Sequence, residues 1–155
     1  MDKAMVGKIL KFILLILLVA AVAFFVVNVI QYSKAAGAAG IGDITKSQMN
    51  SAWLSNAALC AAVLGAAVYL LLDILRMTKI GAFILIAAGV VAVVLLIVAI
   101  GVGGTYLDSL KGVMGVSSVA KAGYYGAIFT TVAHITVFGA APIVFGITKL
   151  FIKNY

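Results

Sequence analysis

Few side chains in this sequence could carry acid–base, nucleophilic or metal chemistry. There is one histidine, His134, one cysteine, Cys60, and four aspartates, and there is no glutamate. A catalytic dyad or a metal cage needs several such groups within reach of one another. The aspartates all flank the apolar stretches, so none lies at the depth of His134. We therefore expect no enzyme activity, no metal site and no cofactor, and a single cysteine allows no intramolecular disulfide.

The elements that hold these residues are four long uncharged stretches, at 12–33, 47–72, 80–107 and 122–148. Each exceeds the roughly 20 residues that a helix needs to cross about 30 Å of hydrocarbon. Only a helix satisfies its own backbone polar groups when lipid surrounds it. A content of 66% hydrophobic residues and a mean hydropathy of +1.30 support the same conclusion. We expect an all-α integral membrane protein with a four-helix (tetraspan) bundle.

We place one transmembrane domain over residues 1–155, with spans at about 10–31, 52–73, 80–104 and 123–148 and outer loops at about 32–51 and 105–122. Most lysines and arginines flank the spans on the side of the termini. They are Lys3, Lys8, Lys11, Arg76, Lys79, Lys149 and Lys153. The remaining ones are Lys34, Lys46, Lys111 and Lys121. The positive-inside rule therefore puts the N- and C-termini in the cytoplasm.

The net charge of +7 comes from these flanking lysines and not from a basic surface interleaved with aromatics. Membrane lipids are therefore the expected electrostatic partner, and no nucleic acid is expected. The N-terminal stretch resembles a secretory signal, but its apolar run to Ile30 is too long for a signal core, so we expect a retained first span. The outer loops lack an N-x-S/T acceptor, which fits a prokaryotic cytoplasmic membrane.

Small side chains recur at every fourth position of the second span. The two rows are Ala57, Ala61, Gly65 and Ala58, Ala62, Ala66, and Gly126 and Thr130 add small residues on the fourth span. Such rows let helix backbones approach closely in lipid. They fit contacts within the chain and contacts between subunits equally well. The stretch from Phe12 to Val19 is bulky and aliphatic, so we expect the first span to face lipid and the second to fourth spans to form any interfaces.

The fourth span carries the polar or gating candidates His134, Thr131 and Pro142. A titratable group in hydrocarbon suggests a proton-sensitive gate or a polar lining residue. The alternative, which we favour, is a neutral imidazole bonded to a neighbouring helix or to the Thr130 carbonyl. Pro142 removes one backbone hydrogen bond and crowds the carbonyl of Phe138, which predicts a kink. A static bend is favoured over a hinge.

A short amphipathic helix is expected in the second outer loop. Its apolar face consists of Tyr106, Leu107, Leu110, Val113 and Met114, which recur at helical spacing. This helix would lie on the outer interface or line a vestibule. The alternative is that these residues are only the end of the third span.

These observations favour a non-catalytic small membrane protein, and three functions fit it. The first is a structural or accessory subunit of a homo-oligomeric or multi-protein membrane assembly, which would explain the small-residue rows. The second is a passive channel with a pore formed between subunits. The third is an immunity or regulatory protein that binds a membrane partner. The expected protein partner is another copy of the chain or another membrane protein.

Overall fold

A computed structural model of the protein describes residues 2–151. The elements are α1 (Lys3–Ala36), α2 (Asp43–Ile74), α3 (Thr78–Val102), α4 (Gly104–Lys111), α5 (Ser118–His134), the π-helical turn η1 (Ile135–Ala140) and α6 (Ala141–Phe151). The last three form one continuous rod. This rod and α1, α2 and α3 are each long and apolar enough to cross a membrane. The expected all-α class and the four apolar helices of membrane-spanning length are confirmed.

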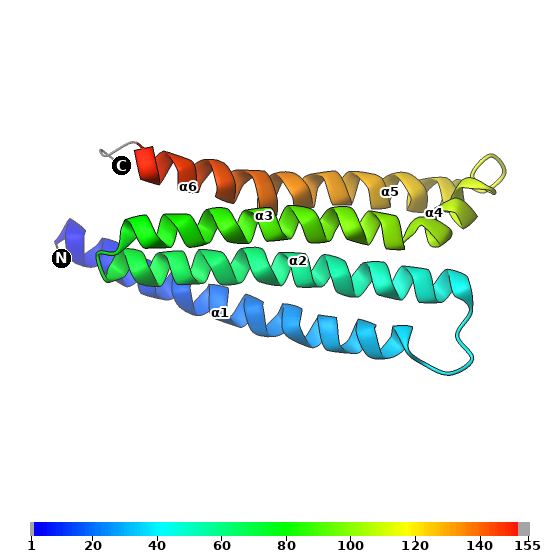
Figure 1. Ribbon diagram of the computed structural model, residues 1–155, viewed down its shortest axis with the longest axis horizontal. Coiled ribbons are helices and arrows are strands. Elements are labelled where there is room, and N and C mark those ends of the chain that lie inside the picture. Colours follow the sequence, from blue (N-terminus) through cyan, green and yellow to red (C-terminus); the bar gives the residue numbers. More distant parts are fainter. Residues whose placement is uncertain (1, 152–155) are drawn as a thin grey trace.

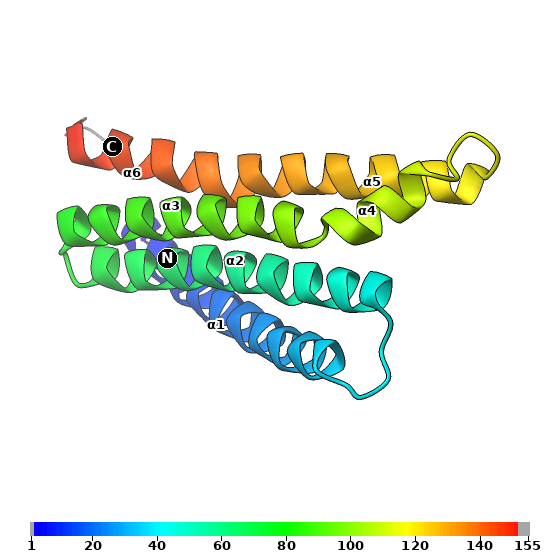
Figure 2. The same cartoon turned by 45° about the vertical axis from the view of Figure 1, so that its right-hand side comes forward.

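The four rods lie side by side in chain order and do not close into a bundle (Figures 1 and 2). The central hairpin of α2 and α3 is antiparallel, as its tight connection predicts, and α1 crosses α2 obliquely on one side. On the other side, α6 and η1 pack along α3. The fold is therefore an open layer in which α2 and α3 carry the outer two rods.

The best-packed region lies where α2, α3 and η1 meet. Ala58 and Ala62 of α2 are buried against Ala92 and Leu96 of α3. Close approach continues at Gly65, where an added Cβ would collide with that of Ala88. The small side chains of this row let the two helix backbones pack closely. In lipid, such packing holds helices together because there is no hydrophobic effect to do so. The neighbouring residues Ala57, Ala61 and Ala66 are half-buried.

The fourth rod approaches α3 closely only along its second half. Gly139 and Gly146 are buried there, and Gly89 of α3 faces them. A Cβ on Gly146 would lie 2.5 Å from Cγ1 of Ile86 and 2.9 Å from the carbonyl oxygen of Ala82. The absence of these side chains is what allows α6 to lie against α3.

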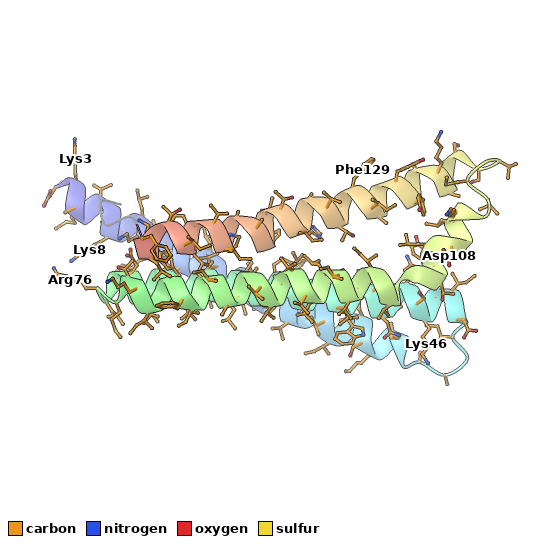
Figure 3. The ribbon with its side chains drawn as sticks, turned by 45° about the horizontal axis from the view of Figure 1, so that its top comes forward. Lys3, Lys8, Lys46, Arg76, Asp108 and Phe129 are labelled. Carbon is orange, nitrogen blue, oxygen red and sulfur yellow. The ribbon has the colours of Figure 1, made fainter. Side chains whose placement is uncertain are left out.

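Near Pro142 the helix is not broken; instead, the turn before the proline is wider than an α-helical turn. Residues Ile135–Ala140 form the π turn η1, which ends directly before the Ala141-Pro142 step. Proline cannot donate to the helix ladder, and π turns accommodate such interruptions. Figure 3 shows the rod bending in this region, so that α5 diverges from α3 while α6 stays beside it.

Charged residues gather at the two ends of the rods. Lys3, Lys8 and Arg76 lie at one end, and Lys46 and Asp108 lie at the other (Figure 3). The rods between them have the apolar composition of membrane spans. We call the end that holds the N-terminus and Arg76 the basic end, and the opposite end the distal end.

An ion pair ties α1 to α2 at the basic end. The Nζ of Lys11 lies 2.7 Å from Oδ2 of Asp73, and the Thr78 hydroxyl donates to Oδ1 over 2.8 Å. Arg76 lies only three residues after Asp73 in the sequence. Arg76 takes the left-handed conformation (φ 62°) that ends α2, and its side chain is exposed. The pair is therefore long-range and fixes where α1 crosses α2.

The distal connections are shorter than the loops expected at 32–51 and 105–122. Helix α1 continues to Ala36 and α2 begins at Asp43, so only 37–42 connect them. In the second connection, α4 occupies Gly104–Lys111 and α5 starts at Ser118.

At the basic end, the Asp2 carboxylate caps the start of α1 by accepting a hydrogen bond from the Ala4 N–H over 3.2 Å.

Candidate functional site

A cavity of about 440 Å³ opens at the distal end, between α2, α4 and α5. It exists because α5 diverges from the central hairpin on the distal side of η1 (Figure 3). Its polar lining residues are Gln48, Ser51, Ser55, Tyr106, Thr130, Thr131 and His134. Small and aliphatic residues complete the wall. We call it the distal cavity.

Three serines lie on one face of α2, and two of them, Ser51 and Ser55, line the cavity opposite α5. Ser47, Ser51 and Ser55 recur at every fourth position, which places them on the same side of the helix. The buried Ser47 hydroxyl donates to the Val102 carbonyl over 2.8 Å and accepts from the Tyr106 N–H over 3.2 Å. It therefore satisfies one backbone group at the end of α3 and one at the start of α4.

Ser51 holds the same corner one turn deeper. Its hydroxyl donates to the Ala99 carbonyl over 2.9 Å. A Cβ on Gly103 would lie 2.9 Å from Ser51 Oγ, so a glycine is needed where α3 gives way to α4. The two serines thus fix the corner that turns α4 away from the axis of α3.

Helix α4 is the short amphipathic helix that the sequence indicates. It begins after Gly103, at the end of α3, and Tyr106 and Leu107 line the distal cavity. Leu110 lies on the same face of α4, and its Cδ1 is 3.5 Å from the position of a Cβ on Gly123 of α5. The last two residues of the expected apolar face, Val113 and Met114, follow the helix in turns. Because α4 contacts both α2 and α5, it holds α5 away from the hairpin.

The polar residues of α5 face the cavity at different depths. The Thr131 hydroxyl bonds back to the Ala127 carbonyl over 2.8 Å, and Thr130 is exposed. His134 is half-buried, with its ring edge-to-face on Phe138 at 5.8 Å between centroids. Among residues 2–151 no protein group hydrogen-bonds the imidazole, including the Thr130 carbonyl. His134 therefore meets the cavity as a polar lining residue.

The other site candidates lie elsewhere. Pro142 lines a separate groove nearer the basic end. Gly126 borders the distal cavity, is exposed, and has no atom within 4 Å of the position of its missing Cβ. The rows of α2 face α3 through Ala58, Ala62 and Gly65. The structure thus brings Thr130, Thr131 and His134 together with the serines of α2, and leaves Pro142 outside.

Two polar features escape the sequence interpretation. The serine row does not stand out in the mean hydropathy of the span, because serine is only weakly polar on that scale. Its spacing of four residues was nevertheless a usable signal. The second feature is an amide bridge between spans, in which Asn28 Nδ2 donates to Asn56 Oδ1 over 3.2 Å. The Asn56 amide also donates to the Ala52 carbonyl over 2.8 Å. Asn28 stands alone in an apolar stretch, where an amide needs a bonding partner.

The chemistry open to the distal cavity is hydrogen bonding, since no lysine, arginine or aspartate is among its described lining residues. Its polar groups are hydroxyls, one amide and one imidazole. Within residues 2–151 no group of three or more His, Cys, Asp or Glu side chains is placed to hold a metal ion. Such a wall can hold water or an uncharged polar molecule. No protein-family model matches the chain, and no curated protein or solved structure matches it.

Proposed function

We propose that this protein is a non-catalytic subunit of a membrane assembly, and that it associates with further copies through α5. The observation that carries this proposal is the divergence of α5. The distal half of the fourth rod lies apart from α3, whereas its other half is packed on glycines. In lipid, helices associate through close packing and interhelical hydrogen bonds. A second helix against α5 would supply both.

The exposed face of α5 has the composition of a helix interface in a membrane. Ala122, Gly126 and Ala133 are small and exposed, and the exposed Thr130 adds a hydroxyl. Space is open at Gly126, so a partner helix could approach the backbone there. Bulky side chains are exposed on both α1 and α5, for example Leu17 at 61% and Phe129 at 67%, but only α5 adds a row of small exposed residues to them. These features favour α5 over α1 as the contact surface.

Disulfide cross-linking in native membranes tests the surface. Gly126→Cys, in a chain whose Cys60 is replaced by alanine, should form a covalent dimer on mild oxidation. Leu17→Cys in the same background is the matched control, since it is also exposed but lies on α1. Equal cross-linking at both positions, or none at Gly126→Cys, would count against α5 as the interface.

A second candidate function is a passive channel with a pore formed between subunits. The supporting observation is that Ser55, Thr130, Thr131 and His134 share one cavity. The groove near the basic end is almost wholly apolar, so a continuous polar path would need facing cavities from several copies. Ion flux into proteoliposomes should then change with His134→Ala and not with Thr136→Ala, whose exposed hydroxyl bonds only within its own helix. Absence of flux at all would remove this candidate.

The orientation and location of the protein follow from its charges. The basic end holds most of the lysines, and such an excess is retained in the cytoplasm. We therefore propose that the basic end lies in the cytoplasm and the distal cavity on the outer side of the membrane. The absence of an N-x-S/T acceptor in the outer loops favours a prokaryotic cytoplasmic membrane. A membrane-impermeant thiol reagent applied from outside should modify Thr45→Cys, in the Cys60→Ala background, in intact cells. Modification only after lysis would reverse this orientation.

A further inference from the structure

The distal cavity contains polar side chains that the chain itself leaves unbonded. Gln48, Ser55 and His134 are half-buried and line the cavity, and none of them has a hydrogen-bond partner among residues 2–151. Hydroxyls elsewhere on the fourth rod behave differently, since Thr136 and Thr148 each donate to the carbonyl four residues earlier. A polar side chain in an apolar span gains from a bonding partner. The cavity therefore offers three hydrogen-bonding groups to a ligand.

These three groups stand at two depths of the cavity. Gln48 and Ser55 lie on one face of α2, about 10 Å apart along the helix axis, and His134 lines the same cavity from α5. The core closes the cavity just beyond Ser55 and His134. Ala58 follows Ser55 by three residues, Ile135 follows His134 directly, and both belong to one packed cluster. The cavity is thus a blind pocket with one hydrogen-bonding group toward its mouth and two at its floor.

Small side chains form flat walls between these groups. Ala52 lies between Gln48 and Ser55 on the same face of α2, and Ala127 lines the wall that α5 provides. Tyr106 adds an aromatic residue from α4. A planar ring packs well against surfaces of this kind. The volume of about 440 Å³ has room for a substituted ring, since an apolar cavity of about 150 Å³ already holds benzene.

The cavity favours an uncharged ligand that arrives from the membrane. None of its described lining residues is a lysine, an arginine or an aspartate, so an ion would lose its water without gaining a counter-ion. Ile100 and Val132 also line the cavity and are 44% and 57% exposed, so the cavity opens sideways on the surface of the apolar rods. A lipid-soluble molecule can therefore enter it without leaving the membrane.

We infer that the distal cavity binds an uncharged, lipid-soluble ring with oxygens on opposite edges, which is the chemistry of a quinone. The ring lies between Ala52 and Ala127. One oxygen accepts from the Ser55 hydroxyl and the His134 imidazole at the floor, and the other accepts from the Gln48 amide. A plain hydrocarbon ring would fit the walls but leave all three donors unbonded. One chain builds the whole cavity, so this site does not depend on association through α5.

The single histidine serves as the reporter in the test. The full-length chain, made with 15N-labelled histidine and without a histidine tag, gives the ring signals of His134 alone in an NMR spectrum in nanodiscs. Duroquinone (tetramethyl-1,4-benzoquinone) should shift these signals to saturation. Durene, the same methylated ring without the oxygens, should not shift them. Ser55→Ala should weaken the apparent affinity for duroquinone about fivefold, the contribution of one neutral hydrogen bond. Thr136→Ala removes a hydroxyl outside the cavity and should leave this affinity unchanged.

Filling the cavity should remove the binding. Ala52→Phe and Ala127→Phe each place a ring in the cavity from a different helix, so a folding defect in one variant does not decide the test. Ala87→Phe on α3 and Ala140→Phe on η1 are the controls, because both alanines are exposed and neither lines the cavity. The shift with duroquinone should disappear in both filled variants and persist in both controls.

Three results would overturn the inference. An equal shift with durene would show that the oxygens are not recognised. The absence of a saturable shift with duroquinone would show that the ring only dissolves in the lipid, and a persistent shift in both filled variants would place the ring elsewhere. The particle mass is measured separately, so a single chain that still gives the saturable shift would contradict the assembly proposal and support this site.

Discussion

The two halves of the fourth rod, α5 on one side of η1 and α6 on the other, have opposite surroundings. On the basic side of η1, α6 lies against α3, with Gly139 and Gly146 buried. On the distal side, α5 stands away from α3, and Gly126 and Thr130 are exposed. Both halves contain glycines, but only α6 meets facing residues that use the space, such as Ile86 and Ala82. A glycine in a membrane helix is therefore informative only together with the surface it faces.

The difference has a local cause at each boundary. The π turn η1 lets the rod change direction before Pro142. At the far end, α4 separates α5 from the hairpin, and Ser47 and Ser51 hold the corner from which α4 starts. The packed half thus serves the fold of the single chain, and the open half is available to other molecules.

The largest effect should come from adding one methyl group to the packed half. Gly146→Ala places a Cβ 2.9 Å from the backbone oxygen of Ala82, which cannot move aside easily, and should lower the free energy of unfolding by about 2 kcal/mol. Gly126→Ala is the matched control in the open half, where the methyl group meets no other helix, and should raise the free energy of unfolding slightly, by up to about 1 kcal/mol, because alanine is the better helix former. Denaturant unfolding in mixed micelles measures both. Equal destabilisation would mean that α5 is packed too.

A somewhat smaller loss of stability is expected at the corner between α3 and α4, which keeps α5 apart from the hairpin. Ser47→Ala leaves the Val102 carbonyl and the Tyr106 N–H without their hydroxyl, at a cost of about 1.5 kcal/mol. The same loss should loosen α4 and increase hydrogen exchange at the amides of Gly104–Lys111. Ser118→Ala, at an exposed site at the start of α5, is the control. Unchanged exchange in α4 would show that other contacts hold the corner.

The smallest effect on stability is expected at the contact between α1 and α2. The Asn28 to Asn56 bridge, at 3.2 Å, should show a coupling free energy of about 0.6 kcal/mol, the average for such bonds in membranes. The double-mutant cycle of Asn28→Leu and Asn56→Leu isolates this value from the change in lipid contact. A coupling near zero would leave the Lys11 to Asp73 pair as the main polar link between α1 and α2.

The spans were predictable because the hydrocarbon thickness sets a length that the sequence displays directly. The tight connection around Arg76 likewise predicts the α2–α3 hairpin. The amphipathic face from Tyr106 to Leu110 was also visible, because four-residue spacing does not depend on the rest of the fold. These features rest on local periodicity and composition.

The assembly of the site was not predictable, because it depends on which helix faces meet. His134 and Ser55 are 79 residues apart and share a cavity only because α5 bends away at η1. Asp73 lies three residues before Arg76 in the sequence, but the crossing of α1 brings Lys11, 62 residues away, to its carboxylate. An open layer in place of a closed bundle also follows from packing between rods, which composition does not encode.

The most direct test of the assembly proposal is the mass of the purified particle in lipid nanodiscs, by native mass spectrometry. The proposal predicts a defined multiple of the 16.0 kDa chain, and Gly126→Trp, which fills the open space on α5, should reduce it to a single chain. A wild-type particle of one chain, with no other polypeptide present, would contradict the claim that the open half of the fourth rod is an interface.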